Sequence, residues 1–408
     1  MALSATAAHP ATAAPESART AYIRLCAAGF LAYCSYAICR TPLLPLFARD
    51  LGADVRLVGL IVSASTVTGI VLKLPAGALS DILGRRPLLV AGALVFAAMP
   101  FAYLGISALA GLIVVRAAHG SATAIFGPVA SARLSDLAPP TRRGAWLSTY
   151  STIQGAGQAV GPIVAGYLIA GGRFDVAFVV AGVVAMAVPV IVFSGATNEG
   201  RPPAPVRDGW TRFAHGIVEV ARDRLILVTS CAQAGQFILH GALSAFLPLY
   251  GREILGLTSG QLGWLFGLQT VTTLASRPIM GTMSDRLGRR GMIIVGVTLC
   301  SAAVALVSQA RSFGSLIGFI LVYAIGVAVS TAATSAFITD LTSRARYGAA
   351  HGIFGTIYDV GDALGPIAAG LLVASVGYAR MFQIVAAAAA MAAVAFWLLS
   401  RGSRGTTA

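Results

Sequence analysis

The sequence has little charge and almost no lysine. Asp, Glu, Lys and Arg make up 11% of its 408 residues, whereas a soluble domain carries about 25%. The single lysine, Lys73, lies in the stretch LKLPAG, so the chain has no GxxxxGK(S/T) nucleotide-binding loop and ATP hydrolysis cannot drive its activity. All the cysteines fall within apolar runs, which argues against a disulfide framework or a clustered zinc site. They are Cys26, Cys34, Cys39, Cys231 and Cys300.

Long apolar runs dominate the chain instead. Hydrophobic residues make up 57% of the sequence, and the mean hydropathy is +0.81. A helix needs roughly 20 mostly apolar residues to cross a bilayer, because its backbone amides must be satisfied within the segment. The pattern predicts twelve crossings, at 22–47, 57–79, 87–106, 109–134, 145–169, 176–194, 225–250, 261–283, 291–309, 313–338, 347–374 and 378–399.

The net charge of +14 comes from arginines in the loops between these spans. Most of these arginines fall on one side of the membrane if the N-terminus is cytoplasmic, as short cytoplasmic loops require. We therefore expect a multi-pass protein of a cell membrane, in a bacterium the cytoplasmic membrane, with both termini in the cytoplasm. Nucleic acid is not expected as a partner.

Stretches rich in Pro, Gly and charged residues separate the apolar runs and divide the chain into five parts. We expect a disordered tail (1–18), a first six-helix bundle (19–197), a cytoplasmic linker with an amphipathic helix (198–223), a second six-helix bundle (224–400) and a cytoplasmic tail (401–408).

The two halves repeat one another in register. GALSDILGRR from Gly77 recurs as GTMSDRLGRR from Gly281, 204 positions later, and GPIVAG from Gly161 recurs as GPIAAG from Gly365 with the same shift. Such duplication is typical of transporters that move a solute by rocking two related halves.

The duplicated segment resembles the signature of the major facilitator superfamily, and the resemblance covers about 22–399. It implies an all-α membrane fold with twelve transmembrane helices in two pseudo-symmetric six-helix bundles. It also implies a charge network that latches the two halves on the cytoplasmic side. Charges that only set the topology are the alternative. The predicted gate residues are Gly77, Asp81, Arg85, Arg86 and Asp136, with Gly281, Asp285, Arg289, Arg290 and Asp340 in the second half.

Gly157, Gly161 and Pro162 in the fifth span resemble the superfamily's antiporter motif, which implies the twelve-helix drug or metabolite:proton antiporter branch. Small residues let helices approach closely, and proline bends a helix. We predict a packing or hinge role for these residues and for Gly365 and Pro366. Simple helix packing without an export function is the alternative.

Ionisable residues inside a span are costly and are functional candidates by default. Asp359 and Asp362 lie three positions apart on the eleventh span and share a helix face, where repulsion in low dielectric favours binding a proton. Arg116, with Gly120 four residues later, resembles the family's RxxxG element. Asp359, Asp362 and Arg116 are therefore the predicted proton-coupling residues. Fixed structural ion pairs are the alternative for the two acids.

The resemblance also implies that the first, fourth, seventh and tenth spans line a central cavity. The predicted substrate-binding residues are Arg40, Arg116, His119, Gln233, Gln236 and His240, with packing or tethering of helices as the alternative. Embedded cations outnumber embedded acids, which favours a substrate with an anionic or acceptor-rich group. Lys73 and its repeat mate Arg277 are expected to extend to the cytoplasmic face.

Together these features predict a non-enzymatic secondary transporter of a small organic molecule that works by alternating access. A proton-coupled efflux antiporter is the favoured form, and an importer or uniporter of an organic anion is the alternative. A monomer without cofactor or metal is expected. An intramembrane aspartyl protease is set aside because Asp359 and Asp362 share one helix. A sensor on the same fold is left open.

Overall fold

The computed structural model describes residues 18–195, 222–343 and 346–401, apart from the side chains of Leu74, Ala78 and Asp81. The predicted tails and the linker helix therefore lie almost wholly outside the described residues. The helices of the first half are α1 (Ala18–Ile38), α2 (Leu43–Asp50), α3 (Val55–Leu83), α4 (Arg85–Ala102), α5 (Leu109–Leu137), α6 (Arg143–Leu168) and α7 (Phe174–Phe193). Those of the second half are α9 (Arg224–Glu253), α10 (Ser259–Leu287), α11 (Arg289–Val307), α12 (Phe313–Asp340) and α13 (Tyr347–Ser400).

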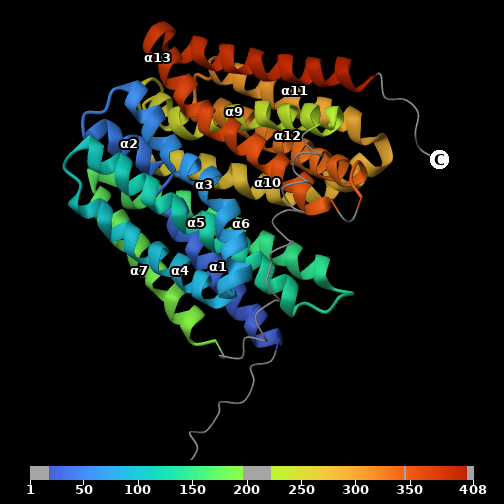
Figure 1. The fold of residues 1–408 in the computed structure, drawn as a ribbon. Helices are drawn as coiled ribbons and strands as arrows, with labels where there is room; N and C mark the ends of the chain where they lie inside the picture. Colours follow the sequence, from blue (N-terminus) through green and yellow to red (C-terminus); the bar gives the residue numbers. More distant parts are fainter. Residues whose placement is uncertain (1–17, 196–221, 344–345, 402–408) are drawn as a thin grey trace, which may run out of the picture.

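These helices make twelve crossings. α1 and α2 together form the first crossing, and α13 forms the last two, since its backbone bends at Gly377 with a φ of 78° that favours glycine. In Figure 1 α1 to α7 form one bundle and α9 to α13 form a second bundle beside it. The predicted all-helical fold of two six-helix halves is confirmed.

The first crossing differs from its prediction as one continuous helix. α1 ends at Ile38 and α2 begins at Leu43, so Arg40 and Thr41 lie in a break. Pro42 has no N–H to donate and disfavours helical backbone at the residue before it, which accounts for the interruption. Arg40 and Thr41 therefore lie outside regular helix, and both line the cavity between the bundles.

The duplicated signature places a glycine at each junction between the second and third crossings of a half. Gly84 ends α3 with a φ of 91°, and Gly288 ends α10 with a φ of 94°. Residues with a Cβ avoid this conformation, so glycine lets the chain turn directly into α4 or α11.

Glycines also set the packing within each bundle. A Cβ on Gly157 of α6 would lie 2.5 Å from the Phe30 carbonyl oxygen of α1. In the second bundle a Cβ on Gly365 of α13 would lie 2.4 Å from the Ile238 carbonyl oxygen of α9. The first and fifth crossings of each half are thus held at backbone contact.

The two bundles touch most closely at the end that carries α2, here called the α2 end. A Cβ on Gly59 of α3 would lie 2.2 Å from the Pro366 carbonyl oxygen of α13, and one on Gly263 of α10 would lie 2.4 Å from the Pro162 carbonyl oxygen of α6. At the opposite end, the terminus end where α1 begins and α13 finishes, a Cβ on Gly77 or Gly281 would have no described atom within 4 Å. Close packing between bundles is therefore concentrated at the α2 end.

Candidate functional site

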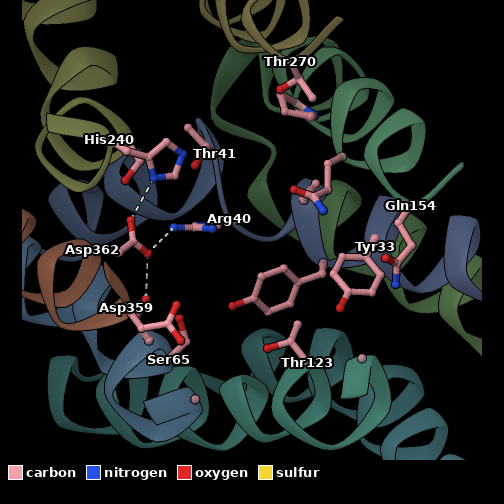
Figure 2. Close-up of a pocket in the computed structure, with 18 of the residues that line it drawn as sticks. Tyr33, Arg40, Thr41, Ser65, Thr123, Gln154, His240, Thr270, Asp359 and Asp362 are labelled. Atoms are coloured by element: carbon pink, nitrogen blue, oxygen red, sulfur yellow. Dashed lines mark hydrogen bonds and ion pairs between the residues drawn. The ribbon is translucent and has the colours of Figure 1, made fainter. Parts of the chain in front are cut away.

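A cavity of about 400 Å³ lies between the two bundles. α1, α3, α5 and α6 line it from the first bundle, and α9, α10 and α13 line it from the second, together with the break before α2. The lining residues are Tyr33, Tyr36, Ala37, Arg40, Thr41, Ser65, Thr66, Gly69, Lys73, Thr123, Gly127, Pro128, Ser131, Gln154, Gln158, Pro162, His240, Ser244, Phe266, Gln269, Thr270, Asp359 and Asp362. Figure 2 shows the charged group on one side and Tyr33 with Gln154 on the other.

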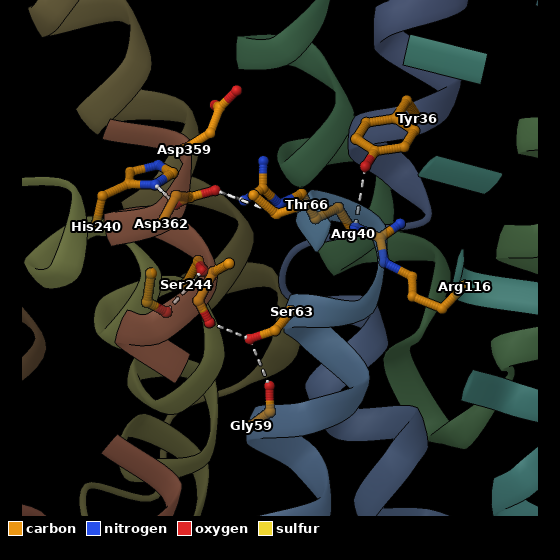
Figure 3. A network of polar contacts seen from close by, with 12 residues as sticks. Tyr36, Arg40, Gly59, Ser63, Thr66, Arg116, His240, Ser244, Asp359 and Asp362 are labelled. Carbon is orange, nitrogen blue, oxygen red and sulfur yellow. Dashed lines mark hydrogen bonds and ion pairs between the residues drawn. The ribbon is translucent and has the colours of Figure 1, made fainter. Parts of the chain in front are cut away.

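Asp362 is the centre of the charged group. Its Oδ1 lies 2.8 Å from His240 Nδ1, and its Oδ2 accepts hydrogen bonds from Arg40 at 3.4 Å and from the Thr66 hydroxyl at 3.2 Å (Figures 2 and 3). The residue is only 8% exposed. Arg40 and Thr66 belong to the first bundle and His240 to the second, so this one carboxylate joins the halves.

Asp359, one helical turn away, makes a second link of the same kind. Its Oδ2 forms an ion pair with Nζ of Lys73 on α3 of the first bundle. Lys73 was expected to extend to the cytoplasmic face, and that expectation is wrong. With a carboxylate available inside the cavity, the ammonium group is compensated there and need not reach water. Lys73 is therefore a site residue that the sequence analysis missed.

Packing of α3 against α13 aims these acids at the first bundle. The Ser63 hydroxyl donates to the Ala363 carbonyl oxygen at 2.7 Å and lies 2.9 Å from the Gly59 carbonyl oxygen of its own helix (Figure 3). Gly59, one helical turn before Ser63, lets the backbones of α3 and α13 come into contact. The face of α13 that carries Asp359 and Asp362 is thereby fixed toward α3.

Arg116 and His119 do not line the cavity, although the sequence analysis placed both in the substrate site. Arg116 is fully buried and donates from NH2 to the Tyr36 hydroxyl at 3.2 Å, behind the cavity wall (Figure 3). The His119 ring lies 3.3 Å from the Tyr103 hydroxyl. Their face of α5 points into the first bundle, and Arg116 reaches the cavity only through Tyr36.

Gln233 and Gln236 are likewise buried away from the cavity. The hydroxyls of Ser330 and Thr334 on α12 donate to Gln233 Oε1 at 3.2 and 2.7 Å, and Gln236 donates to the Tyr323 hydroxyl at 3.3 Å. Gln233 lies two turns from His240, roughly 10 Å along α9, at the level where α12 packs. These amides tether α9 to α12, which was the alternative interpretation of the sequence.

The expected set of cavity-lining spans also needs correction. α12, the tenth crossing, contributes no described lining residue, whereas α3, α6, α10 and α13 contribute two to four residues each. The low hydropathy of some spans already indicates which of them line the cavity. Nine stretches of the described residues are long and apolar enough to span a membrane, and α6 and α10 are not among them. Their polar residues, such as Gln158 and Gln269, lower the hydropathy because they face the cavity.

The predicted gate residues form two equivalent networks at the terminus end. Arg85 Nε lies 3.2 Å from Asp136 of α5, and Arg289 Nε lies 2.9 Å from Asp340 of α12. Arg289 also pairs with Asp285. These pairs join helices of the same bundle, so a latch between bundles stays a prediction. The side chain of Asp81 lies outside the described residues.

The remaining gate and hinge residues lie at helix contacts. Arg86 donates to the Phe193 carbonyl oxygen at 3.4 Å, and the Arg290 guanidinium lies 5.6 Å from the Phe337 ring centre. A Cβ on Gly161 would lie 2.5 Å from Ala37 Cβ, beside the cavity. The carbonyls of Pro162 and Pro366 form the contacts between bundles described above.

A model of the Major Facilitator Superfamily matches the chain over residues 25–260 and again over 242–407, once for each half. The chain belongs to this superfamily. It is therefore a multi-pass membrane transporter of small molecules, and the predicted resemblance is confirmed.

Curated relatives match most of this major facilitator transporter. It is 25% identical over 350 residues to an uncharacterised transporter of the superfamily from Methanocaldococcus jannaschii, covering 85% of this chain and 89% of the relative. It is 24% identical over 335 residues to the multidrug resistance protein MdtH of Aeromonas hydrophila, with 80% and 81% covered. It is 21% identical over 355 residues to the multi-drug resistance efflux pump PmrA of Streptococcus pneumoniae, with 84% and 86% covered.

Solved structures show the same fold. A bacterial homologue of the human lysosomal transporter Spinster, in an inward-facing and unoccupied conformation, superposes with a TM-score of 0.78 at 14% identity. A POT family transporter in complex with 5-aminolevulinic acid gives the same values. In both cases 94% of this chain and 97% of the other chain are covered.

Proposed function

We propose that this protein is a proton-coupled efflux antiporter, which exports a small organic molecule from the cytoplasm by alternating access. The observation that carries the proposal is the pair of carboxylates at the cavity, each bound to a basic side chain of the opposite bundle. Relatives named as multidrug resistance and efflux proteins support export. The arginine-rich terminus end would face the cytoplasm.

The proposed coupling uses the links that Asp359 and Asp362 make across the bundle boundary. A proton that binds to either carboxylate removes its negative charge and weakens its attraction to Lys73 or Arg40. A carboxyl that takes up its proton while the cavity is open at the α2 end keeps it as the bundles close there again, so the proton travels toward the terminus end. Loss of the proton restores the ion pairs and the conformation described here.

Substrate and proton would use the same groups in alternation. In the conformation closed at the α2 end, a substrate entering from the terminus end would compete with the carboxylates for Arg40 and Lys73. Its binding would release an acid to take up a proton after the cavity reopens at the α2 end. Substrate and proton therefore move in opposite directions, one up and one down its gradient.

Uniport or import of an organic anion is the second candidate function. The observation that favours it is the convergence of Arg40 and His240 on one side of the cavity (Figure 2), with Lys73 paired to Asp359 in the same charged group. An anion could replace the carboxylates as their partner without any proton being moved.

The test is proton flux in vesicles that contain the purified protein and a trapped pH-sensitive dye. An opposed substrate gradient should drive proton movement in the unmodified protein, and Asp359→Asn and Asp362→Asn should reduce it at least tenfold. Asp175→Asn, an exposed acid at the start of α7, is the matched control and should behave as the unmodified protein. Both cavity variants transporting with unchanged pH dependence would contradict the proposal, and substrate flux without proton flux would favour the uniporter.

A further inference from the structure

The lining of the cavity is unusually polar for a site that holds a drug-like molecule. Seventeen of its 23 residues have polar side chains, and none of the 23 is Leu, Ile, Val, Met or Trp. Sites for lipophilic ligands are lined mainly by aliphatic and aromatic side chains. A lipophilic body placed here would strip water from hydroxyl, amide and charged groups without replacing their hydrogen bonds, which is unfavourable.

The charged side of the cavity holds both signs in balance. Arg40 and Lys73 supply two positive charges, and Asp359 and Asp362 supply two negative charges. A simple cation or anion could satisfy only one sign and would leave the displaced partner unpaired in a site of low dielectric, which is costly. A solute that carries both an acidic and a basic group can replace a carboxylate and a cation at once.

The amide side of the cavity has hydrogen-bonding groups without partners. In the described part of the chain, neither the Gln158 nor the Gln269 side chain makes a hydrogen bond, and Gln269 is only 8% exposed. The two residues come from different bundles, on α6 and α10. A side-chain amide offers both donors and an acceptor, which match hydroxyl or amide groups of a ligand.

We propose that the substrate is a water-soluble zwitterion whose body carries hydroxyl or amide groups, and not a lipophilic cation. The acidic group of the substrate binds Arg40 and Lys73, and its basic group binds Asp359 or Asp362. Its polar body lies against Gln158 and Gln269. This inference rests on the proposed function only in taking the cavity as the transport site.

Gln158→Leu and Gln269→Leu test it without disturbing the fold, because neither amide makes an internal hydrogen bond among the described residues. Each change replaces a polar lining group with an apolar one of similar size. Gln309→Leu, in an exposed turn after α11, is the matched control. Binding is measured on the full chain in detergent as a thermal shift, with glutamine, serine and other hydroxyl- or amide-bearing amino acids, and with tetraphenylphosphonium and ethidium.

The expected result is binding of at least one zwitterion and of neither lipophilic cation. Each lining variant should weaken zwitterion binding about two- to tenfold, the range for one lost hydrogen bond, while the control leaves it unchanged. Binding of either lipophilic cation to the unmodified protein more tightly than any zwitterion would overturn the inference, as would a folded protein that binds no zwitterion.

Flux in vesicles separates this inference from the proposed function. A zwitterion that moves without proton flux supports the substrate class and contradicts proton antiport. A lipophilic cation that moves with proton flux and competes for the cavity supports antiport and overturns the substrate class.

Discussion

Asp362 and Arg40 form an ion pair with 3.4 Å between Oδ2 and NH2, although 322 positions separate them in the sequence. Arg40 lies within the first crossing, in the break between α1 and α2, and Asp362 lies in the eleventh crossing. The pair therefore exists only while the bundles are in this arrangement. Its contribution to stability and its role in transport can be measured separately.

Arg40→Gln should destabilise the protein more than the double change Arg40→Gln with Asp362→Asn. The single change leaves a buried carboxylate with less compensation, which costs about 1–3 kcal/mol after allowance for the partial exposure of Arg40. The second change removes the charge and restores part of the loss. Thermal unfolding in detergent measures both variants, and equal melting temperatures for the single and double variants would contradict the pairing.

Gly59→Ala should disfavour the conformation that is closed at the α2 end. The new Cβ would lie 2.2 Å from the Pro366 carbonyl oxygen, and backbone cannot move aside without separating α3 from α13. Distances between spin labels at the α2 end should shift toward longer values. Gly318→Ala on α12, where a Cβ meets nothing within 4 Å, is the matched control and should leave the distances unchanged.

Gln233→Leu should lower stability and leave substrate affinity unaltered. Two hydroxyls of α12 and the Gln236 side-chain oxygen each lose one hydrogen bond to Gln233, for a cost of about 1–3 kcal/mol. Thermal unfolding and ligand titration on the same preparation separate the two effects. A large loss of affinity with a normal melting temperature would return Gln233 to the substrate site.

Asp340→Asn should slow transport with little effect on stability. The pair of Asp340 with Arg289 is about half exposed on the acid side, and such surface pairs contribute only ~0–1 kcal/mol. If the network controls movement at the terminus end, turnover in vesicles falls while the melting temperature stays nearly constant. Arg311→Ala, at an exposed position before α12, serves as the control. Unchanged turnover would indicate that these charged residues only set the membrane topology.

The fold was predictable because its signals are local and repeated. Apolar runs of the right length give the crossings, and the segments starting at Gly77 and Gly281 identify the two halves without any three-dimensional information. The break at Pro42 was missed, since it depends on the backbone at one or two residues.

The pairing of the site residues was not predictable in the same way. Asp359 and Asp362 could be selected because acids inside a span are rare. Their partners in the first bundle lie 286 to 322 positions away, and the packing of α3 on α13 decides whether each acid meets such a partner or solvent. Gln233 and Gln158 illustrate the same difficulty, because two glutamines in similar helices differ only in whether a neighbouring helix covers them.

Lys73 bears the only side-chain amine of the protein, and it opens onto the cavity with 41% of its side chain exposed. Amine-selective reagents therefore have a single internal target, at the boundary of the two halves, without any engineered handle. An isotope or fluorophore attached there by ordinary acylation chemistry would report on the transport path alone. A bound solute that shields this amine would be seen as protection from the reagent.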